Sequence, residues 1–414
     1  MARHRKHARS SAVAVAGATA GMTAVLTFGQ VADATAAVTA IGVGGWRNPD
    51  STRVNQKFGG DYMPSGSGFV APDHFIPVPY SASLPIDPSV EDGLPVLRQK
   101  VGETSGDIVI VGYSEGSIVA EKYKRELDAQ GSPPPGKNIS FVFIAAPTVP
   151  NGGIYARFPD LRLPGFTSTG AAETSPYDQT FITIEYDPVG DFPAYANPLS
   201  LANALAGLIY LHGDPTPDAA DLNDPDAIIV TPVDKPGGGQ DTYILVRTEH
   251  LPLLQPIRDV SAALNITAIT EPLLGAIEPT LKLGVDMGYT DRDYSDPATP
   301  TRFRLTTPPE RIAETIKQLP DAFQQGADNV KNGLPSTATP STTSGPTQRI
   351  TAKKDEAKVP QKPAKRTPAQ RRDNMRNAVP DLAKKVKNTF KPKPKSKPRH
   401  ETKPKTESDT DKAA

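Results

Sequence analysis

The sequence predicts an α/β domain in which a mostly parallel sheet is covered by helices on both faces. Short apolar runs rich in β-branched and aromatic residues recur along the chain, and they alternate with segments of helical apolar spacing. The runs are almost continuously apolar, which is typical of strands that are covered on both faces. Five strands are therefore expected, at residues 38–43, 107–112, 139–145, 181–186 and 242–246.

Three segments between these strands have the periodicity of helices. Residues 89–101 carry one apolar stripe, although Pro95 lies inside it. Residues 117–127 are amphipathic, and residues 199–211 form a mostly apolar run with helical spacing. Residues 74–80 are compatible with a further short strand.

Composition divides the chain of 414 residues into four parts. Residues 38–332 are expected to form the folded domain, followed by a Pro/Ser/Thr-rich linker at residues 333–350. Residues 351–414 form a Lys/Pro-rich tail with about 20 Lys and Arg against about 8 acidic residues, although the formal net charge of the whole chain is zero. Such a tail cannot bury enough apolar surface to offset its chain entropy, so it is expected to be disordered.

The N-terminal part, residues 1–37, predicts export. A basic start precedes an uncharged apolar run at residues 12–28, and Ala32, Ala34 and Ala36 then suit a signal-peptidase site. The run is short for a spanning helix, so a cleaved signal is favoured over an uncleaved anchor or a disordered N-terminus. We therefore expect a secreted or cell-envelope-associated protein.

The strand at residues 107–112 ends in Gly-Tyr-Ser-Glu-Gly, and a helix is expected directly after it. In this Gly-x-Ser-x-Gly pattern the serine occupies a strained turn, and the two glycines let neighbouring backbones approach closely. Ser114 is therefore the candidate nucleophile, with the backbone N–H of Glu115 as an oxyanion-hole donor. The alternative is a serine in a tight turn that has no catalytic role.

A serine nucleophile needs a base, and the chain has six histidines. Three lie near the termini and His74 precedes the serine, which is against the Ser, acid, His order of this architecture. His250 is the favoured base because it follows the strand at residues 242–246, at the same sheet edge as Ser114. His212, at the end of an apolar helix, is the alternative.

The acid is expected in the loop after the strand at residues 181–186, which contains two aspartates. Asp191, farther into the loop, is preferred, and Asp187 is the alternative acid. The aspartate that is not the acid would cap a turn. A second oxyanion-hole donor is expected in the loop after the first strand, at Gly45 or Trp46.

Four motifs in this order carry a family resemblance: "GVGG", "GYSEGS", "IEYDPVGDFPAYANPLSLANALAGLIYLHG" and "TEHLPLLQPIRD". Together they resemble the PE-PPE domain of mycobacteria and their relatives, a cutinase-like serine hydrolase of the α/β-hydrolase fold, over residues 38–324. The resemblance implies esterase or lipase activity on acyl esters and, in some relatives, acyl transfer between envelope glycolipids. Ser114, Asp191 or Asp187, and His250 fall on the family's triad motifs.

Two features depart from the family pattern. The first loop has Trp46 where the family usually has Thr after the Gly-Gly pair, which leaves the shape of the pocket open. No PE or PPE helical module precedes the domain in this sequence, so the N-terminal segment is expected to direct export.

The sequence leaves three functions to compare. The first is an exported serine esterase or lipase, the second an acyltransferase of envelope glycolipids, and the third a non-catalytic envelope-binding protein. No cofactor or metal is expected, because the chain has no cysteine and no paired-histidine motif. The expected partners are an acyl ester or lipid substrate and, through the basic tail, an anionic envelope polymer or lipid; no nucleic acid is expected.

Overall fold

The computed structural model describes residues 37–333, apart from 132–133, 214, 237–238, 291, 293 and 295–299. The chain separates into two compact units, Met1–Ser344 and Gly345–Ala414, and all of the described residues belong to the first unit. The predicted signal segment, most of the linker and the basic tail lie outside the described residues.

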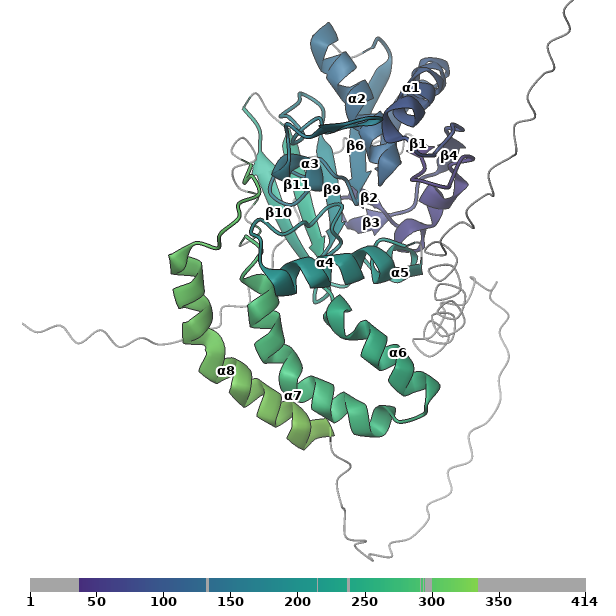
Figure 1. Cartoon of the computed structure of the whole chain (residues 1–414). Coiled ribbons are helices and arrows are strands. Elements are labelled where there is room, and N and C mark those ends of the chain that lie inside the picture. The colour runs from purple at the N-terminus through teal and green to yellow at the C-terminus, as the bar shows by residue number, and fades with distance from the viewer. Residues whose placement is uncertain are drawn as a thin grey trace, which may run out of the picture. The chain divides into compact units, whose positions relative to one another are not determined.

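The described unit is built on a seven-stranded sheet with the strand order β10-β11-β9-β6-β5-β1-β4 (Figure 1). The six strands from β4 to β11 are parallel, and β10 at the edge runs antiparallel to β11. The strands are β1 (Thr39–Val43), β4 (His74–Pro77), β5 (Gly106–Tyr113), β6 (Lys137–Ile144), β9 (Gln179–Ile184), β10 (Ile228–Asp234) and β11 (Gln240–Val246). Two small hairpins lie outside the sheet: β2 (Met63–Ser65) with β3 (Gly68–Val70), and β7 (Arg162–Leu163) with β8 (Phe166–Thr167).

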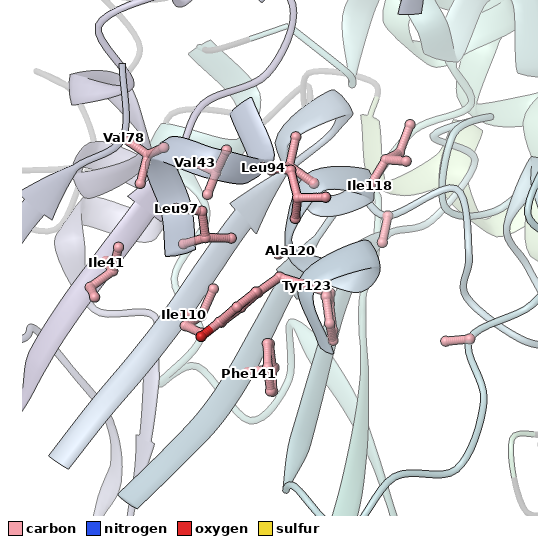
Figure 2. Close-up of a cluster of buried hydrophobic side chains, with 14 of the residues drawn as sticks. Ile41, Val43, Val78, Leu94, Leu97, Ile110, Ile118, Ala120, Tyr123 and Phe141 are labelled. Atoms are coloured by element: carbon pink, nitrogen blue, oxygen red, sulfur yellow. The ribbon is translucent and has the colours of Figure 1, made fainter. Parts of the chain in front are cut away.

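Helices cover both faces of the sheet. Successive side chains of a strand point to opposite faces, so neighbouring strand residues belong to different cores. Ile110 and Phe141 belong to one core, shown in Figure 2, together with side chains of α1 (Ile86–Glu103) and α2 (Glu115–Gln130). Val111 and Val142, each one position further along, belong to the other core. That second core includes residues of η1 (Thr52–Gly60) and α7 (Thr267–Asp286).

The remaining helices are α3 (Ile154–Arg157), α4 (Pro198–Tyr210), α5 (Pro215–Ala219), η2 (Pro252–Leu254), α6 (Gln255–Ala263) and α8 (Pro309–Gly333). Helix α4 packs against η2 and α7, and α7 and α8 run side by side (Figure 1). Among the described residues, no helix has the length and apolar character that crossing a membrane requires.

The structure confirms the predicted fold class, since the five expected strands are β1, β5, β6, β9 and β11 and the three expected helices are α1, α2 and α4. Residues 74–80 contain β4. The sequence interpretation missed the antiparallel strand β10. Pro232 lies within β10, and proline is tolerated there because β10 pairs on one side only, at the edge of the sheet.

Candidate active site

Ser114 occupies the turn between β5 and α2, and its backbone is strained as the sequence predicts. Its φ of 54° and ψ of −116° lie outside the regions that residues with a Cβ normally adopt. The flanking glycines are required by close contacts. A Cβ on Gly112 would lie 2.5 Å from Cα of Ser117, and a Cβ on Gly116 would lie 2.2 Å from the carbonyl oxygen of Val43.

The Ser114 turn follows β5, at the point where the order in which successive strands are added to the sheet reverses. The chain passes from β1 to β4 on one side, whereas β5, β6 and β9 follow one another on the other side. In open parallel sheets, ligands bind beside the carboxyl ends of the strands at such a point. A Cβ on Gly45, in the loop after β1, would lie 3.0 Å from Cβ of Ser114, so this loop lies directly against the serine.

Two backbone groups beside Ser114 suit an oxyanion. Glu115 is the first residue of α2, so its N–H has no acceptor within its own helix and lies at the positive end of the helix dipole. The backbone of Gly45 is the second neighbour. Trp46 follows on the same loop, with its side chain half exposed and the Arg47 guanidinium 5.4 Å from its ring centroid.

Ser114 is connected to His212 and Asp187 by two short hydrogen bonds. The Oγ of Ser114 lies 2.8 Å from Nε2 of His212, and Nδ1 of His212 lies 2.9 Å from both carboxylate oxygens of Asp187. Because a carboxylate can only accept, Nδ1 carries the proton and Nε2 is left to accept the hydroxyl proton of Ser114. Asp187 is fully buried, which keeps water from competing for this contact.

His212 is held from several sides. The hydroxyl of Tyr113 donates to the His212 backbone carbonyl, and the two rings stack with centroids 5.7 Å apart. The Lys57 Nζ lies 4.3 Å from the Tyr113 ring centroid and 2.8 Å from a carboxylate oxygen of Asp218. Asp218 belongs to α5, which begins three residues after His212, so the ion pair fixes the segment that follows the histidine.

The structure does not place His250 beside Ser114, which corrects the expected position of this side chain. The His250 side chain is 47% exposed, and its Nδ1 lies 3.0 Å from Glu278 on α7. Burial would raise the pKa of Glu278, but hydrogen bonds from His250 and Arg258 lower it to about 2. His250 therefore belongs to an ion-pair cluster between the loop after β11 and the helices that follow.

Asp191 is likewise not the aspartate that contacts a histidine. It is buried and accepts two hydrogen bonds from Nε and Nη2 of Arg292, the shorter at 2.8 Å. It also accepts from the backbone N–H of Tyr186, at 2.8 Å. Burial opposes the charge of Arg292, yet Asp191 holds the pKa of this guanidinium well above its ordinary value. Asp191 thus shapes the loop that presents Asp187.

Asp187 has two of the features that the sequence interpretation assigned to different residues. It contacts His212, and one of its oxygens also accepts the backbone N–H of Val189 at 3.1 Å, which forms the turn expected of the other aspartate. Its position directly after the strand expected at residues 181–186 is the signal that the sequence offers. The contacts of Lys57, Tyr113 and Arg292 carried no sequence signal, because their partners lie about 100 or more residues away.

Glu115 is a buried carboxyl group directly after Ser114. Its side chain is 3% exposed, and neither carboxylate oxygen has a hydrogen-bond partner among the described residues. Burial therefore raises its pKa to about 7, and the nearby Ser89 and Ser83 only partly offset this. Tyr80, whose hydroxyl donates to the carbonyl of Gly44, lies close enough for the charge of Glu115 to raise the tyrosine pKa further.

A cavity of about 370 Å³ lies away from this constellation. It is lined mainly by ends of β10 and β11 and by Glu185, Lys282 and Arg292, and Ser114 does not line it. Three of its charged groups are already paired: Lys282 contacts Glu185 and Asp286, and Arg292 contacts Asp191. The described residues contain no group of three His, Asp or Glu side chains that could hold a metal ion.

Comparison with known proteins extends these observations. Esterase PE16 of Mycobacterium tuberculosis (strain ATCC 25618 / H37Rv) is 38% identical over 245 residues, which cover 56% of this chain and 44% of that protein. The uncharacterized PPE family protein PPE28 of the same strain is 34% identical over 55% of this chain and 34% of its own length. The SL1278 acyltransferase Chp1, also of that strain, is 28% identical over 55% of each chain. This chain thus spans about a third to a little over half of these relatives.

A family model described as the PE-PPE domain matches residues 66–290. The matched region begins after β1 and includes Ser114, Asp187 and His212, together with Asp191 and the ion pair of His250 with Glu278. More than half of the chain lies within this match. The chain therefore belongs to the PE-PPE domain family.

Proposed function

We propose that the chain is a serine hydrolase that cleaves carboxylic esters through an acyl-enzyme, with Ser114 as nucleophile, His212 as base and Asp187 as the acid. The observation that carries the proposal is the unbroken hydrogen-bonded series from the Ser114 hydroxyl through the imidazole to the buried Asp187 carboxylate. The strained turn that presents Ser114 and the similarity to Esterase PE16 support it.

In the proposed first half-reaction, the Oγ of Ser114 forms a bond to the ester carbonyl carbon while its proton passes to Nε2 of His212. The carbonyl oxygen becomes an oxyanion, which the N–H of Glu115 and a backbone N–H at Gly45 or Trp46 stabilise. The tetrahedral intermediate then expels the alcohol oxygen, which takes the proton from Nε2. Asp187 accepts from Nδ1 throughout, so it orients the ring and stabilises the imidazolium.

In the second half-reaction, a water molecule gives a proton to Nε2 and attacks the acyl carbon. Collapse of the new intermediate breaks the bond to Oγ, and Ser114 recovers its proton from His212. The products are a carboxylic acid and the free enzyme.

An acyltransferase is the second candidate, and the similarity to the SL1278 acyltransferase Chp1 favours it. The acyl-enzyme would be the same, but a hydroxyl of an acceptor such as an envelope glycolipid would replace water. Exclusion of water from the site decides between the two outcomes. A non-catalytic binding protein is less well supported, because binding alone gives no reason for a strained serine connected to an imidazole and a buried carboxylate.

Hydrolysis of p-nitrophenyl esters of increasing acyl length tests the proposed activity. Ser114→Ala should lower kcat/KM by about 10⁴-fold or more, since no other group can form the acyl-enzyme. The matched control is Ser67→Ala, in the exposed turn between β2 and β3, and it should retain the parent value. Equal activity of Ser114→Ala and the parent would overturn the assignment. Adding an excess of a polyol as acyl acceptor then separates the two candidate functions. An acyltransferase should form mainly the new ester, whereas a hydrolase should form mainly the free acid.

We further propose that the protein is exported and associates with the cell envelope. The support comes from the sequence: the basic start and apolar run of the N-terminal segment, and the excess of Lys and Arg in residues 351–414. An acyl ester or lipid of the envelope would then be the substrate.

A further inference from the structure

Helix α6 has an inverted distribution of side chains. Its buried residues are Arg258 and Ser261, whereas Ile257, Val260 and Leu264 are exposed to 48%, 57% and 62%. The three aliphatic residues follow the i, i+3, i+7 spacing, so they form one stripe on the outer side of the helix. A helix that buries Arg258 and exposes an aliphatic stripe does not have the arrangement expected of a surface that faces water.

Helix α7 also exposes an aliphatic stripe, although its buried residues Pro272, Leu274 and Val285 are apolar. Ile269, Leu273 and Ile277 are spaced four residues apart and are 68%, 63% and 52% exposed. The side of α7 that faces α6 is acidic: Arg258 lies 3.3 Å from Glu271 and 2.7 Å from Glu278. The two helices therefore meet through ion pairs and turn their aliphatic stripes outward.

We call these two stripes the aliphatic surface: Ile257, Val260, Leu264, Ile269, Leu273 and Ile277. It adjoins the candidate active site through α4, because α4 packs against α7 and ends two residues before His212. The exposed side of α4 is also aliphatic, with Leu205 at 65% and Leu208 at 46%. A layer that covered the aliphatic surface would thus lie next to the helix that leads to the proposed base.

Two features indicate which partner covers the aliphatic surface: its composition, and the charge of the segment that follows α8 in the same chain. Its members are all Ile, Leu or Val, whereas protein interfaces concentrate Trp, Tyr and Arg at their centres. Helix α8 packs on α7 so closely that a Cβ on Gly326 would lie 2.1 Å from the Ala276 carbonyl oxygen. From its end at Gly333 the chain continues for 81 residues, of which the last 64 carry the excess of Lys and Arg.

We propose that the aliphatic surface is the face on which the protein lies on an anionic lipid layer, with the side chains of α6 and α7 inserted among the acyl chains. A basic segment in the same chain and an exposed aliphatic surface are two signals that together can give stable association with an anionic lipid layer. The proposal deepens the proposed function, on which it rests for the substrate: an acyl ester held in a lipid layer.

Co-sedimentation of the full chain with vesicles of phosphatidylcholine and phosphatidylglycerol tests the proposal. Val260→Gln combined with Leu273→Gln should lower the partition coefficient roughly tenfold or more, because two aliphatic side chains no longer enter the acyl region. The matched control is Leu161→Gln with Leu163→Gln, an exposed pair at β7, and it should bind as the parent does. Binding of the parent should persist, at a lower level, in high salt.

The reactivity of Ser114 can be checked in the same variants without measuring ester turnover. Fluorophosphonate labelling of Ser114 should be equal in the parent and in both double variants, which separates a failure of lipid binding from a failure of the proposed chemistry. Equal partition of the Val260→Gln/Leu273→Gln variant and the parent overturns the proposal. A parent that forms a dimer, does not bind vesicles and becomes a monomer in that variant assigns the surface to a second copy of the chain instead.

Discussion

At the scale of single residues, the site depends on which aspartate and which histidine have partners elsewhere. Asp191 and His250 are both paired with groups from distant parts of the chain, Arg292 and Glu278. Asp187 instead contacts His212, and His212 contacts Ser114. A sequence interpretation can identify all four candidates, but it cannot see the pairings that occupy two of them.

Exchange of each aspartate for asparagine separates the two roles. Asp187→Asn should lower kcat by about 10³ to 10⁴-fold with little effect on stability, because the imidazole loses its oriented tautomer. Asp191→Asn should instead destabilise the fold by about 3 kcal/mol, since the largely buried Arg292 loses its shortest ion pair and keeps only the longer contacts to Glu185 and Asp286. Steady-state kinetics and urea denaturation of both variants check this. The reverse pattern would return Asp191 to the acid position.

The buried Glu115 gives the stability a pH dependence with a defined sign. Its folded-state pKa of about 7 lies above the ordinary value of 4.5, so between these values the folded protein binds more protons than the unfolded chain. The free energy of unfolding should therefore fall as the pH rises from about 4.5 to about 7. Glu115→Gln should flatten the profile in this window, as measured by denaturation at several pH values. An unchanged slope would assign it to other groups.

At the scale of elements, strand order explains why the sequence predicted the sheet but not the histidine that contacts Ser114. The apolar runs and the Ser114 turn are local, so β5, its strained serine and α2 are correctly predicted. The order of the strands within the sheet, in contrast, depends on contacts between residues that are far apart in the chain. The loop after β11 is three strand positions from β5, roughly 14 Å at the usual strand spacing, which puts His250 beyond reach of Ser114.

Helix α4 spans the distance from β9 to β5, which are two strand positions apart. It follows β9 and brings His212 to the hydroxyl of Tyr113 at the end of β5. Its approach to the loop of Asp187 requires a glycine, because a Cβ on Gly207 would lie 2.1 Å from the Tyr186 carbonyl oxygen. A histidine at the end of an apolar helix looks structural in a sequence, since nothing local indicates what the helix end faces.

Gly207→Ala tests the placement of this helix. The added methyl group should displace α4 from Tyr186, which should cost about 1 to 3 kcal/mol of stability and lower kcat by moving His212. The matched control is Gly275→Ala in α7, where the new Cβ would have its nearest neighbour, Cβ of Asn329, at 3.4 Å. Alanine there should be neutral or stabilising, because alanine favours helices. Thermal unfolding and ester hydrolysis of both variants provide the comparison, and equal behaviour would contradict the role given to Gly207.

At the scale of the whole molecule, charge is divided unevenly along the chain. The chain has 46 basic and 46 acidic residues, and residues 351–414 hold about 20 of the first and about 8 of the second. The part before them is therefore acidic by about 12 charges. A basic segment on an acidic protein provides attraction to anionic surfaces without making the whole chain basic.

Removal of residues 351–414 tests the proposed tethering. The truncated protein should associate less with the envelope fraction, and the difference from the full chain should shrink as salt is added, because exposed charges are screened over about 8 Å at physiological ionic strength. Fractionation at low and high salt measures this. Identical fractionation of the two proteins would leave the tail without a tethering role.

The central claim is that His212, and not His250, activates Ser114, and the rate of labelling by a fluorophosphonate probe tests it most directly. We expect a label on Ser114, located by peptide mass, that forms in His250→Gln at close to the parent rate and in His212→Gln at least about 10³-fold more slowly. Loss of labelling in His250→Gln with retention in His212→Gln would instead assign the activation of Ser114 to His250.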